Sequence, residues 1–318
     1  MTTIPLHILQ LQFKCQLLDD LFCPADKLGN TLRGAFGMAF KRLSCVKSGG
    51  CEGYCTGECL YGQVFEPKIT NGPGPSGLVD PPRPFVFVPM PHASVYKAGD
   101  FLDFSINIFG EMTRYYPQFI EVFRILEVEG LGAHRSRFRI KLVLGDCGDG
   151  RTHTVYSQSN AINSIPEIGV YRPRITSVHE QRFRFDFLMP AQIKANGRTV
   201  REPSFGDIFR RLRDRISAIM LFYENSNFEA RFQQLGALAD GVTTTAKNWT
   251  WHENARVSSR TKLSQNLSGV KGWAEFDTGT PENLNAFLPW LELGQYVNVG
   301  KTSTWGMGRF KISLSKYN

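Results

Sequence analysis

Four cysteines lie close together in the first quarter of the chain, in a segment that is rich in glycine. They are Cys45, Cys51, Cys55 and Cys59, separated by five, three and three residues. A structural zinc site holds the ion in a tetrahedron of four soft ligands, and the intervening glycines would let the chain wrap around it. The spacing differs from the paired Cys-x-x-Cys pattern of zinc ribbons, so an iron–sulfur cluster and a set of reduced or disulfide-prone thiols are the alternatives. We expect structural zinc, with all four positions filled by the protein and none open for chemistry.

A glycine-rich stretch near the C-terminus is the second chemical feature, and residues 293–318 contain no acidic residue. Glycines let backbone N–H groups approach a phosphate closely, and Tyr296 and Trp305 are able to stack on bases. A Walker loop is excluded because Gly300-Lys301-Thr302 lacks the upstream glycine and the following helix. An ordinary glycine turn beside an edge strand is the alternative. We expect this stretch to bind RNA through Gly300, Lys301, Trp305, Gly306, Gly308 and Arg309.

Three basic clusters lie elsewhere in a chain of net charge +8, a balance that favours polyanionic partners. The arginines of residues 198–215 suit a solvated helix face and an RNA-binding face equally well. Residues 256–271 contain no acidic residue, and residues 134–141 would place alternate cations on one strand face as a phosphate track. From the first two clusters we expect RNA contacts by Arg210, Arg211, Arg256, Ser259, Arg260 and Lys271.

The composition limits the classes of protein to which the chain can belong. Its 318 residues are 42% hydrophobic and 21% charged, which suffices for two folded domains and argues against disorder. No apolar run approaches the length of a membrane span, and the N-terminus lacks a basic leader. Clustered cysteines argue against a secreted disulfide framework. We therefore expect a cytoplasmic protein with no membrane partner.

The hydrophobic periodicity predicts the same succession of elements in both halves of the chain. In the first half we expect a strand, a helix, two strands, a helix and a strand at residues 7–15, 25–43, 85–88, 101–109, 115–129 and 137–144. In the second half the same order is expected at residues 182–188, 207–222, 242–251, 270–276, 281–291 and 309–314. This order is typical of the ferredoxin-like fold.

We therefore expect an α+β protein with tandem ferredoxin-like (RRM-like) domains, each an antiparallel sheet with helices on one face. The first domain would span residues 1–150 with a cysteine-rich insertion at 45–66, and the second residues 178–318 with the glycine-rich loop. A short internal repeat supports a duplication. Gly130-Leu131-Gly132 precedes Arg-Phe-Arg-Ile, and Gly306-Met307-Gly308 precedes Arg-Phe-Lys-Ile, each just before the expected last strand of its domain.

Several segments together, in their order and spacing, resemble the CRISPR precursor-RNA processing endoribonucleases of the RAMP superfamily. They are LRGAFG (32–37), PPRPFVFVPMP (81–91), residues 99–110 and 130–140, RVSSRTKLSQNLSGVKGW (256–273) and LPWLELGQYVNVGKTSTWGMGRFKI (288–312). The resemblance implies cleavage of CRISPR repeat RNA with no cofactor for catalysis, followed by retention of the guide RNA (crRNA). Metal-free cleavage proceeds by attack of a 2′-hydroxyl and leaves a 5′-hydroxyl and a cyclic phosphate. The implied partners are repeat RNA, crRNA and other CRISPR effector subunits.

The catalytic residues are less evident, because this family often places a histidine on or just after the first helix and this sequence has none there. We expect Arg33 and Lys41 to hold phosphate and stabilise its charge, and His134 to serve as the acid–base residue. Solvated helix-surface charge is the alternative for Arg33 and Lys41. His252 and His92 are reserve candidates for proton transfer.

The missing helix histidine leaves a second function open, in which the protein is a catalytically inactive crRNA-binding subunit of a CRISPR effector complex. A third hypothesis, a zinc-containing protein-interaction module, leaves the acid-free glycine-rich stretch unexplained. Salt-dependent RNA binding would separate this third hypothesis from the other two.

Overall fold

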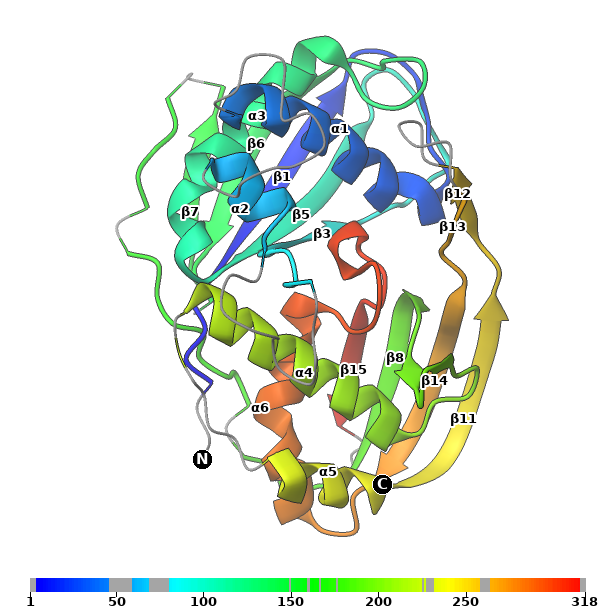
Figure 1. Cartoon of the computed structure of the whole chain (residues 1–318). Helices are drawn as coiled ribbons and strands as arrows, with labels where there is room; N and C mark the ends of the chain where they lie inside the picture. Colours follow the sequence, from blue (N-terminus) through cyan, green and yellow to red (C-terminus); the bar gives the residue numbers. More distant parts are fainter. Residues whose placement is uncertain are drawn as a thin grey trace. The chain divides into compact units, whose positions relative to one another are not determined.

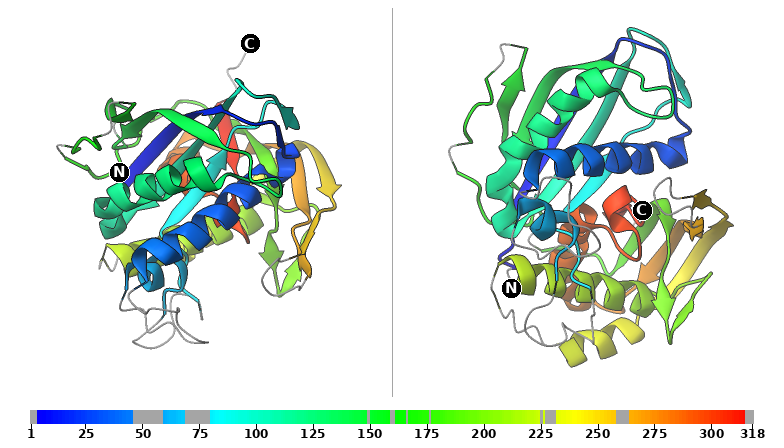
Figure 2. Two further views of the ribbon diagram at one scale, coloured as in Figure 1. Left: turned by 90° about the horizontal axis from the view of Figure 1, so that it is seen from above. Right: turned by 45° about the horizontal axis from the view of Figure 1, so that its top comes forward.

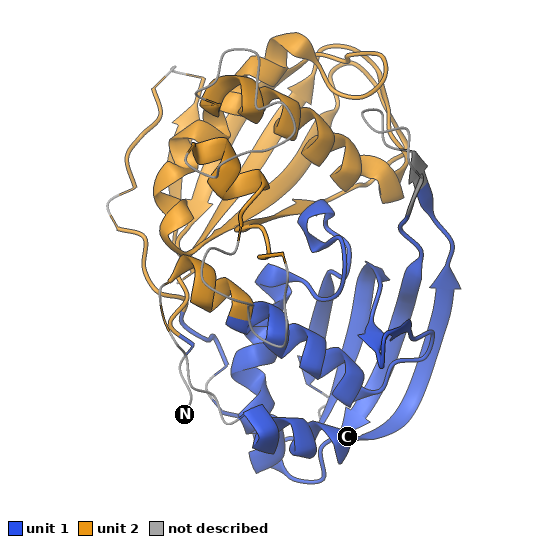
Figure 3. Ribbon diagram, in the orientation of Figure 1, with its two compact units in different colours: residues 1–4, 172–217, 227–318 blue, residues 5–171, 218–226 orange. Residues whose placement is uncertain are grey.

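The computed structural model describes most of the chain as two compact units (Figure 3). Unit 1 comprises residues 1–4, 172–217 and 227–318, and unit 2 comprises residues 5–171 and 218–226. The side chains of residues 256, 257, 264 and 265 are not described. The described residues are 4–45, 59–68, 80–148, 150–158, 161–165, 167–175, 177–224, 226, 232–257 and 264–314.

Unit 2 is an antiparallel sheet with two helices against one face (Figures 1 and 2). The strands lie in the order β3-β5-β1-β6-β7, so the first strand of the unit is in the middle. The elements are β1 (Ile8–Leu17), α1 (Leu28–Ser44), β3 (Phe85–Pro89), β5 (Phe101–Phe109), α3 (Tyr116–Glu129), β6 (Phe138–Asp146) and β7 (Thr152–Ser157). Short elements complete the unit: β2 (Leu21–Phe22), η1 (Ala25–Lys27), α2 (Leu60–Phe65), β4 (Val95–Tyr96) and η3 (Gly110–Tyr115).

Phenylalanine rings fill the space between α1, α3 and the sheet of unit 2. Phe36 of α1 is fully buried, and its ring centroid lies 5.2–5.8 Å from those of Phe40, Phe65, Phe85, Phe87, Phe119 and Phe123. Phe13 of β1 stacks on Phe104 of β5, with centroids 4.9 Å apart. Phe36 therefore lies on the buried face of the helix that the sequence period predicts. Burial of this aromatic surface contributes favourably to the free energy of folding of the unit.

Unit 1 repeats the arrangement with a four-stranded antiparallel sheet in the order β11-β14-β8-β15. Its main elements are β8 (Arg182–Ala191), α4 (Phe205–Tyr223), β11 (Thr243–His252), β14 (Gly269–Asp277), α6 (Pro281–Val297) and β15 (Phe310–Leu314). Residues 218–223 of α4 are counted with unit 2. The smaller elements are β9 (Lys194–Ala195), β10 (Arg198–Thr199), α5 (Phe232–Asp240), β12 (Ala255–Val257), β13 (Ser264–Asn266) and η4 (Ser303–Trp305).

The ferredoxin-like fold class is confirmed in both units. In each unit the second, third, first and last strands of the βαββαβ succession lie side by side in that order. The two repeated glycine pairs also share a conformation, because Gly130, Gly132, Gly306 and Gly308 have φ of 74°, 72°, 85° and 66°. The left-handed region is costly for residues with a Cβ, so the repeat in the sequence reflects one backbone requirement met twice.

The boundary between the units differs from the one expected. The sequence predicts a first domain that ends at residue 150, whereas unit 2 continues to residue 171. The reason is β7, which pairs with β6 from Leu142↔Ser157 to Asp146↔Thr152 and so extends the sheet by one strand. Helix α6 is also longer than expected and continues past Pro289 to Val297.

The aromatic core gives a direct stability test. Phe36→Ala removes the ring that contacts six others, and we expect a loss of about 3–5 kcal/mol in the free energy of unfolding. Phe22→Ala is the control because Phe22 is 65% exposed, and we expect a change within about 0.5 kcal/mol. Chemical denaturation of both variants measures the difference, and equal effects would contradict the assignment of Phe36 to the centre of the core.

Candidate nucleic-acid interface

The glycine-rich loop, residues 298–309, joins α6 to β15 within unit 1. Backbone hydrogen bonds hold it against the end of β8: Gly308 N–H donates to the Pro190 carbonyl at 2.9 Å, and Lys301 N–H donates to the Gln192 carbonyl at 3.3 Å. Val299 N–H donates to the Gly308 carbonyl at 3.1 Å and closes the loop on itself. The loop is therefore a defined turn, fixed by main-chain contacts.

Two glycines of this loop are required by close backbone contacts. A Cβ on Gly308 would lie 1.7 Å from the Val299 carbonyl oxygen, and a Cβ on Gly300 would lie 2.6 Å from the Gln192 carbonyl oxygen. Both glycines also have positive φ, at 66° and 89°. The glycines thus serve first to let the loop fold, and by the same absence of side chains they leave main-chain groups accessible to a ligand.

A pair of lysines marks the surface of the loop. Lys301 is exposed, and the Lys194 ammonium of β9 lies close enough to lower the pKa of Lys301 from its ordinary value; desolvation lowers it further. Two neighbouring ammonium groups repel each other in the free protein, so a bound anion would relieve that repulsion. Lys194 was not among the residues expected from the sequence, because the pairing of β9 with β10 brings it to the loop.

The remaining loop residues differ in their accessibility. Arg309 is partly buried, and burial lowers the pKa of its guanidinium. Trp305 is only 7% exposed, so its ring packs inside the unit and offers no open face for the base stacking expected of it. Gly306 adopts φ of 85° as the C-cap of η4, and its role is conformational.

The arginines expected to bind RNA on α4 have carboxylate neighbours in the structure. Arg210 pairs with Asp240 of α5, and Arg211 pairs with Asp214 at 3.1 Å. Lys271 is exposed on β14. Arg256 belongs to β12 but its side chain is not described, and Ser259 and Arg260 lie outside the described residues.

The two cations expected to be catalytic lie on one face of α1, against α2. The Arg33 guanidinium carbon is 5.4 Å from the centroid of the Phe65 ring, and Lys41 Nζ is 5.7 Å from that of Tyr61. Tyr61 and Phe65 stack on each other at 5.3 Å. Such cation–π contacts are worth about 0.5–1 kcal/mol each, so part of the role of Arg33 and Lys41 is to hold α2 against α1.

The histidines expected to transfer protons lie in other elements. His134 is exposed in the turn between Leu131 and Ser136, which form an antiparallel bridge. His92 packs edge-on against Tyr96 at 4.9 Å, and His252 is the last residue of β11. His134 and His92 are both exposed, so both have the accessibility that acid–base chemistry requires.

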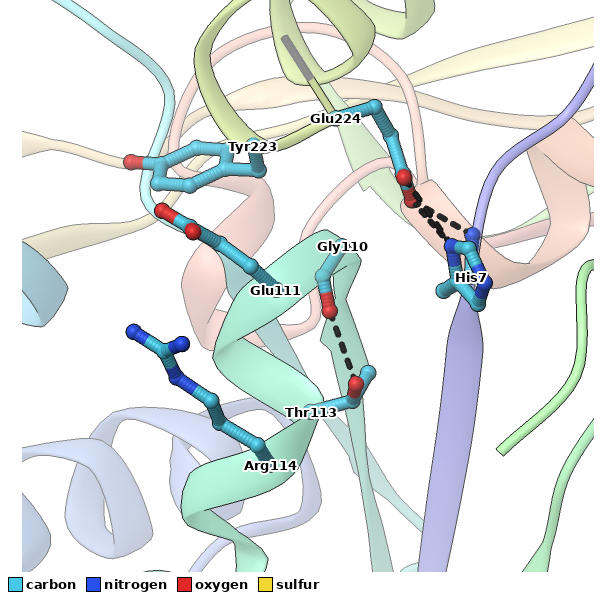
Figure 4. Close-up of a pocket in the computed structure, with 7 residues that line it drawn as sticks. All are labelled: His7, Gly110, Glu111, Thr113, Arg114, Tyr223 and Glu224. Carbon is cyan, nitrogen blue, oxygen red and sulfur yellow. Dashed lines mark hydrogen bonds and ion pairs between the residues drawn. The ribbon is translucent and has the colours of Figure 1, made fainter. Parts of the chain in front are cut away.

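The structure adds a histidine that the sequence did not single out. His7 Nδ1 lies 2.9 Å from Glu224 Oε2, and the His7 backbone N–H donates to Glu224 Oε1 at 2.6 Å (Figure 4). The pair borders a cavity of about 260 Å³ in unit 2, also lined by Gly110, Glu111, Thr113, Arg114 and Tyr223. When Nδ1 donates to the carboxylate, Nε2 is left as an acceptor, and the His7 side chain is 40% exposed. No isolated motif signals this pair, because Glu224 follows α4 while His7 precedes β1.

Two protein families match the chain by sequence. Residues 6–167 match the N-terminal domain family AF_1859_N, and residues 185–310 match the CRISPR-associated endoribonuclease Cas6 family. An uncharacterized protein of Archaeoglobus fulgidus is 27% identical over 291 residues, which cover 90% of this chain and 91% of that protein.

Solved Cas6 structures share the fold. A Cas6 product complex aligns with a TM-score of 0.56 at 17% identity, over 96% of this chain and 99% of that chain. Cas6 of Thermus thermophilus aligns with a TM-score of 0.54 at 15% identity, over 97% and 99% of the two chains. A partial Cas6-RT-Cas1–Cas2 complex aligns with a TM-score of 0.59 at 13% identity, over 99% of this chain and 47% of that chain. The chain belongs to the AF_1859_N family by its first half, and residues 185–310 of its second half match the Cas6 family.

The Cas6 match runs from β8 to the first residue of β15 and so encloses the glycine-rich loop together with Lys194 and Lys301. Within the described part of the chain, no helix combines the length and apolar character needed to cross a bilayer. The Cas6 match and this loop therefore point to the same surface of unit 1 as the candidate nucleic-acid interface.

The cysteine cluster is described only at its two ends. The Cys45 N–H donates to the Lys41 carbonyl at the end of α1, and Cys59 is the 7% exposed N-cap residue of α2. Cys51 and Cys55 lie outside the described residues. Among the residues that are described, no group of three or more His, Cys, Asp or Glu side chains could hold a metal ion. The four-cysteine site stays a prediction.

The backbone requirement at Gly308 is testable by substitution with alanine. We expect Gly308→Ala to lower the thermal midpoint and weaken RNA binding, because the new Cβ meets the Val299 carbonyl oxygen. Gly279→Ala is a matched control, since Gly279 has φ of 79° but no atom within 4 Å of the position that a Cβ would take. The left-handed backbone alone costs ~1–3 kcal/mol in both variants, so the excess in Gly308→Ala measures the close contact. Equal thermal midpoints and equal RNA affinities would contradict it.

Proposed function

We propose that this protein is a metal-independent endoribonuclease of the Cas6 kind, which cuts CRISPR precursor RNA within its repeats and keeps the product as a bound guide RNA. The observation that carries the proposal is the glycine-rich loop inside the Cas6 match, with Lys194 and Lys301 side by side at its surface. This combination suits an RNA phosphate, because the anion offsets the repulsion between two ammonium groups. The reaction takes place in the cytoplasm, with repeat RNA as the partner.

The chemistry follows from the substrate. The RNA 2′-hydroxyl is the nucleophile, so the protein needs only to align it with the scissile phosphate, transfer protons and stabilise the charge of the phosphorane. The products are a 5′-hydroxyl and a cyclic phosphate. Each of these tasks is within the capacity of side chains, which is why the reaction is proposed to need no metal.

The roles proposed for individual residues use the side chains of unit 2. Arg33 and Lys41 stabilise phosphate charge, from positions where their aromatic neighbours hold them on one face of α1. His134 is the proposed acid–base residue because its turn leaves it exposed. His7 is a second candidate, since Glu224 orients its ring in the way that a carboxylate orients a general base.

A catalytically inactive crRNA-binding subunit is the second candidate function. It is supported by one observation, the lack of a histidine in α1, whose sequence is LGNTLRGAFGMAFKRLS. Binding by the glycine-rich loop would serve this function equally well, so only an assay of cleavage separates the two.

The decisive test incubates the purified protein with its cognate repeat RNA in excess EDTA and analyses the ends of the products. We expect one cut that leaves a cyclic phosphate and a 5′-hydroxyl. Tight binding without cleavage would contradict the nuclease proposal and support the crRNA-binding subunit. A strict need for added divalent cation would contradict the metal-free mechanism.

Four variants assign roles in the same assay: Arg33→Ala, Lys41→Ala, His134→Ala and His7→Ala. Loss of one charge-stabilising or proton-transferring group is expected to lower the cleavage rate about 100-fold while repeat RNA still binds. Arg42→Ala is the matched control on α1, because Arg42 is exposed and pairs with Glu129. A normal rate in a variant removes that residue from the mechanism.

The cysteine cluster is proposed to hold one structural zinc ion through Cys45, Cys51, Cys55 and Cys59. We expect native mass spectrometry to find one zinc per chain, lost in Cys59→Ser and kept in Cys147→Ser, whose thiol lies outside the cluster. Purified protein without metal, or with iron, would contradict the zinc assignment.

A further inference from the structure

Strand β11 forms one edge of the sheet of unit 1 and carries two tryptophans on a single face. Trp249 pairs with Gly272, and Gly272 pairs with Phe187 of β8, so the three residues form one row across the sheet. Because Gly272 has no side chain, the Trp249 ring reaches over it to Phe187, with centroids 5.5 Å apart. Trp251 lies two residues further along the same strand and therefore on the same face. Both tryptophans remain partly exposed.

A cation already lies over the second of these rings. The Arg201 guanidinium carbon is 5.0 Å from the centroid of the Trp251 ring. Arg201 is itself exposed, in the connection between β10 and α4. Lys247 precedes Trp249 by two residues on the same face and pairs with Glu202. We call Trp249, Trp251 and Arg201 the tryptophan ledge.

The β9–β10 hairpin links the tryptophan ledge to the glycine-rich loop. At the start of the hairpin Lys194 neighbours Lys301, and just beyond its end Arg201 covers Trp251. The hairpin lies on the same side of the sheet as α4 (Figures 1 and 2). Phe187 and Trp249 share that side, because Phe183, on the same face of β8 as Phe187, packs on Phe205 of α4 with centroids 5.5 Å apart. The tryptophan ledge therefore lies on the same surface of unit 1 as the lysine pair, where an RNA strand would place a phosphate.

We propose that the tryptophan ledge is a base-stacking site for single-stranded RNA, at which a nucleobase stacks on Trp251 beside Trp249. This inference rests on the proposed function and adds a contact between the protein and the RNA base. The base takes the place of the exposed Arg201 guanidinium over the ring, and Arg201 turns to a phosphate of the same strand. Stacking on an aromatic ring accepts any base, so the site contributes affinity without reading the sequence.

The chemistry of the surroundings favours RNA over a protein partner. The side chains beside the two rings include Arg201 and Lys247, and the carboxylate of Glu202 is already paired with Lys247. Half-exposed aromatic rings interleaved with cations are typical of surfaces that grip single strands, where rings hold bases and cations hold phosphates.

The chain contains a matched control for this proposal. Trp273 of β14 also carries a cation, since the Arg184 guanidinium carbon lies 3.9 Å from its ring centroid. However, Trp273 pairs with Asn248 and Asp186, so it lies on the opposite face of the sheet from Trp249. Replacement of Trp273 therefore removes the same type of side chain and the same kind of contact, but from the face of the sheet opposite to the tryptophan ledge.

The test measures the dissociation constant of single-stranded repeat RNA as a function of salt for Trp251→Leu, Trp273→Leu and Lys301→Ala. We expect Trp251→Leu to weaken binding about tenfold with an unchanged salt slope, because stacking releases no counterions. Lys301→Ala should reduce the slope by about one, as loss of a phosphate contact does. Trp273→Leu should match the parent protein, and Trp251→Phe should restore most of the affinity.

A second measurement identifies the stacked nucleotide. Repeat RNAs with a single abasic position should bind the parent protein less tightly at one position only, and that penalty should vanish in Trp251→Leu. Equal affinities of Trp251→Leu and the parent protein, or equal losses in Trp251→Leu and Trp273→Leu, would overturn the ledge while leaving the proposed function intact. No RNA binding by the parent protein would overturn both. Thermal unfolding of each variant verifies that the fold is retained.

Discussion

In each unit the last strand must return beside the first, and this return depends on glycines at positive φ. A Cβ on Gly130 would lie 2.0 Å from the Arg135 carbonyl oxygen, and a Cβ on Gly308 would lie 1.7 Å from the Val299 carbonyl oxygen. The same constraint has different consequences in the two units. In unit 2 it gives a short turn that exposes His134, whereas in unit 1 it gives a longer loop that exposes Lys301 beside Lys194. The fold thus creates the candidate interface as a by-product of closing a sheet.

The contribution of each basic side chain to the positive surface depends on whether its neighbour is a carboxylate or another cation. Arg210 and Arg211 are paired with carboxylates, so their contribution to a positive surface is largely cancelled. Lys194 and Lys301 have each other as neighbours, and the Lys194 ammonium lowers the pKa of Lys301. A polyanion gains most where the repulsion between two such cations is relieved. Net charge therefore favours polyanionic partners as a class, while the pairing of individual cations indicates which surface would bind them.

The sequence predicted the regular part of the fold and only part of the site. The amphipathic helices followed from periodicity because one face of each is buried, and residues 101–109 followed because their alternating apolar residues from Leu102 to Ile108 are buried. Strand β7 and the β9–β10 hairpin could not be predicted, since their existence depends on pairing with distant or very short segments. For the same reason Lys194 was missed, although Lys301 was expected. The sequence shows that residue 305 is a tryptophan but not that its side chain is only 7% exposed, and for this reason Trp305 was expected to stack on bases.

Cation–π contacts show why residue type alone does not assign a role here. Arg33 and Lys41 lie over rings of α2, whose Phe65 is buried in the aromatic core, so the cations and the core stabilise each other. Arg201 lies over the partly exposed Trp251 at the sheet edge, where no core depends on the contact. Breaking the first kind of contact removes about 0.5–1 kcal/mol of packing between α1 and α2, whereas exchanging the second for a stacked base leaves the packing of the core unchanged. The burial of the ring, more than the identity of the cation, decides which contacts a ligand is able to replace.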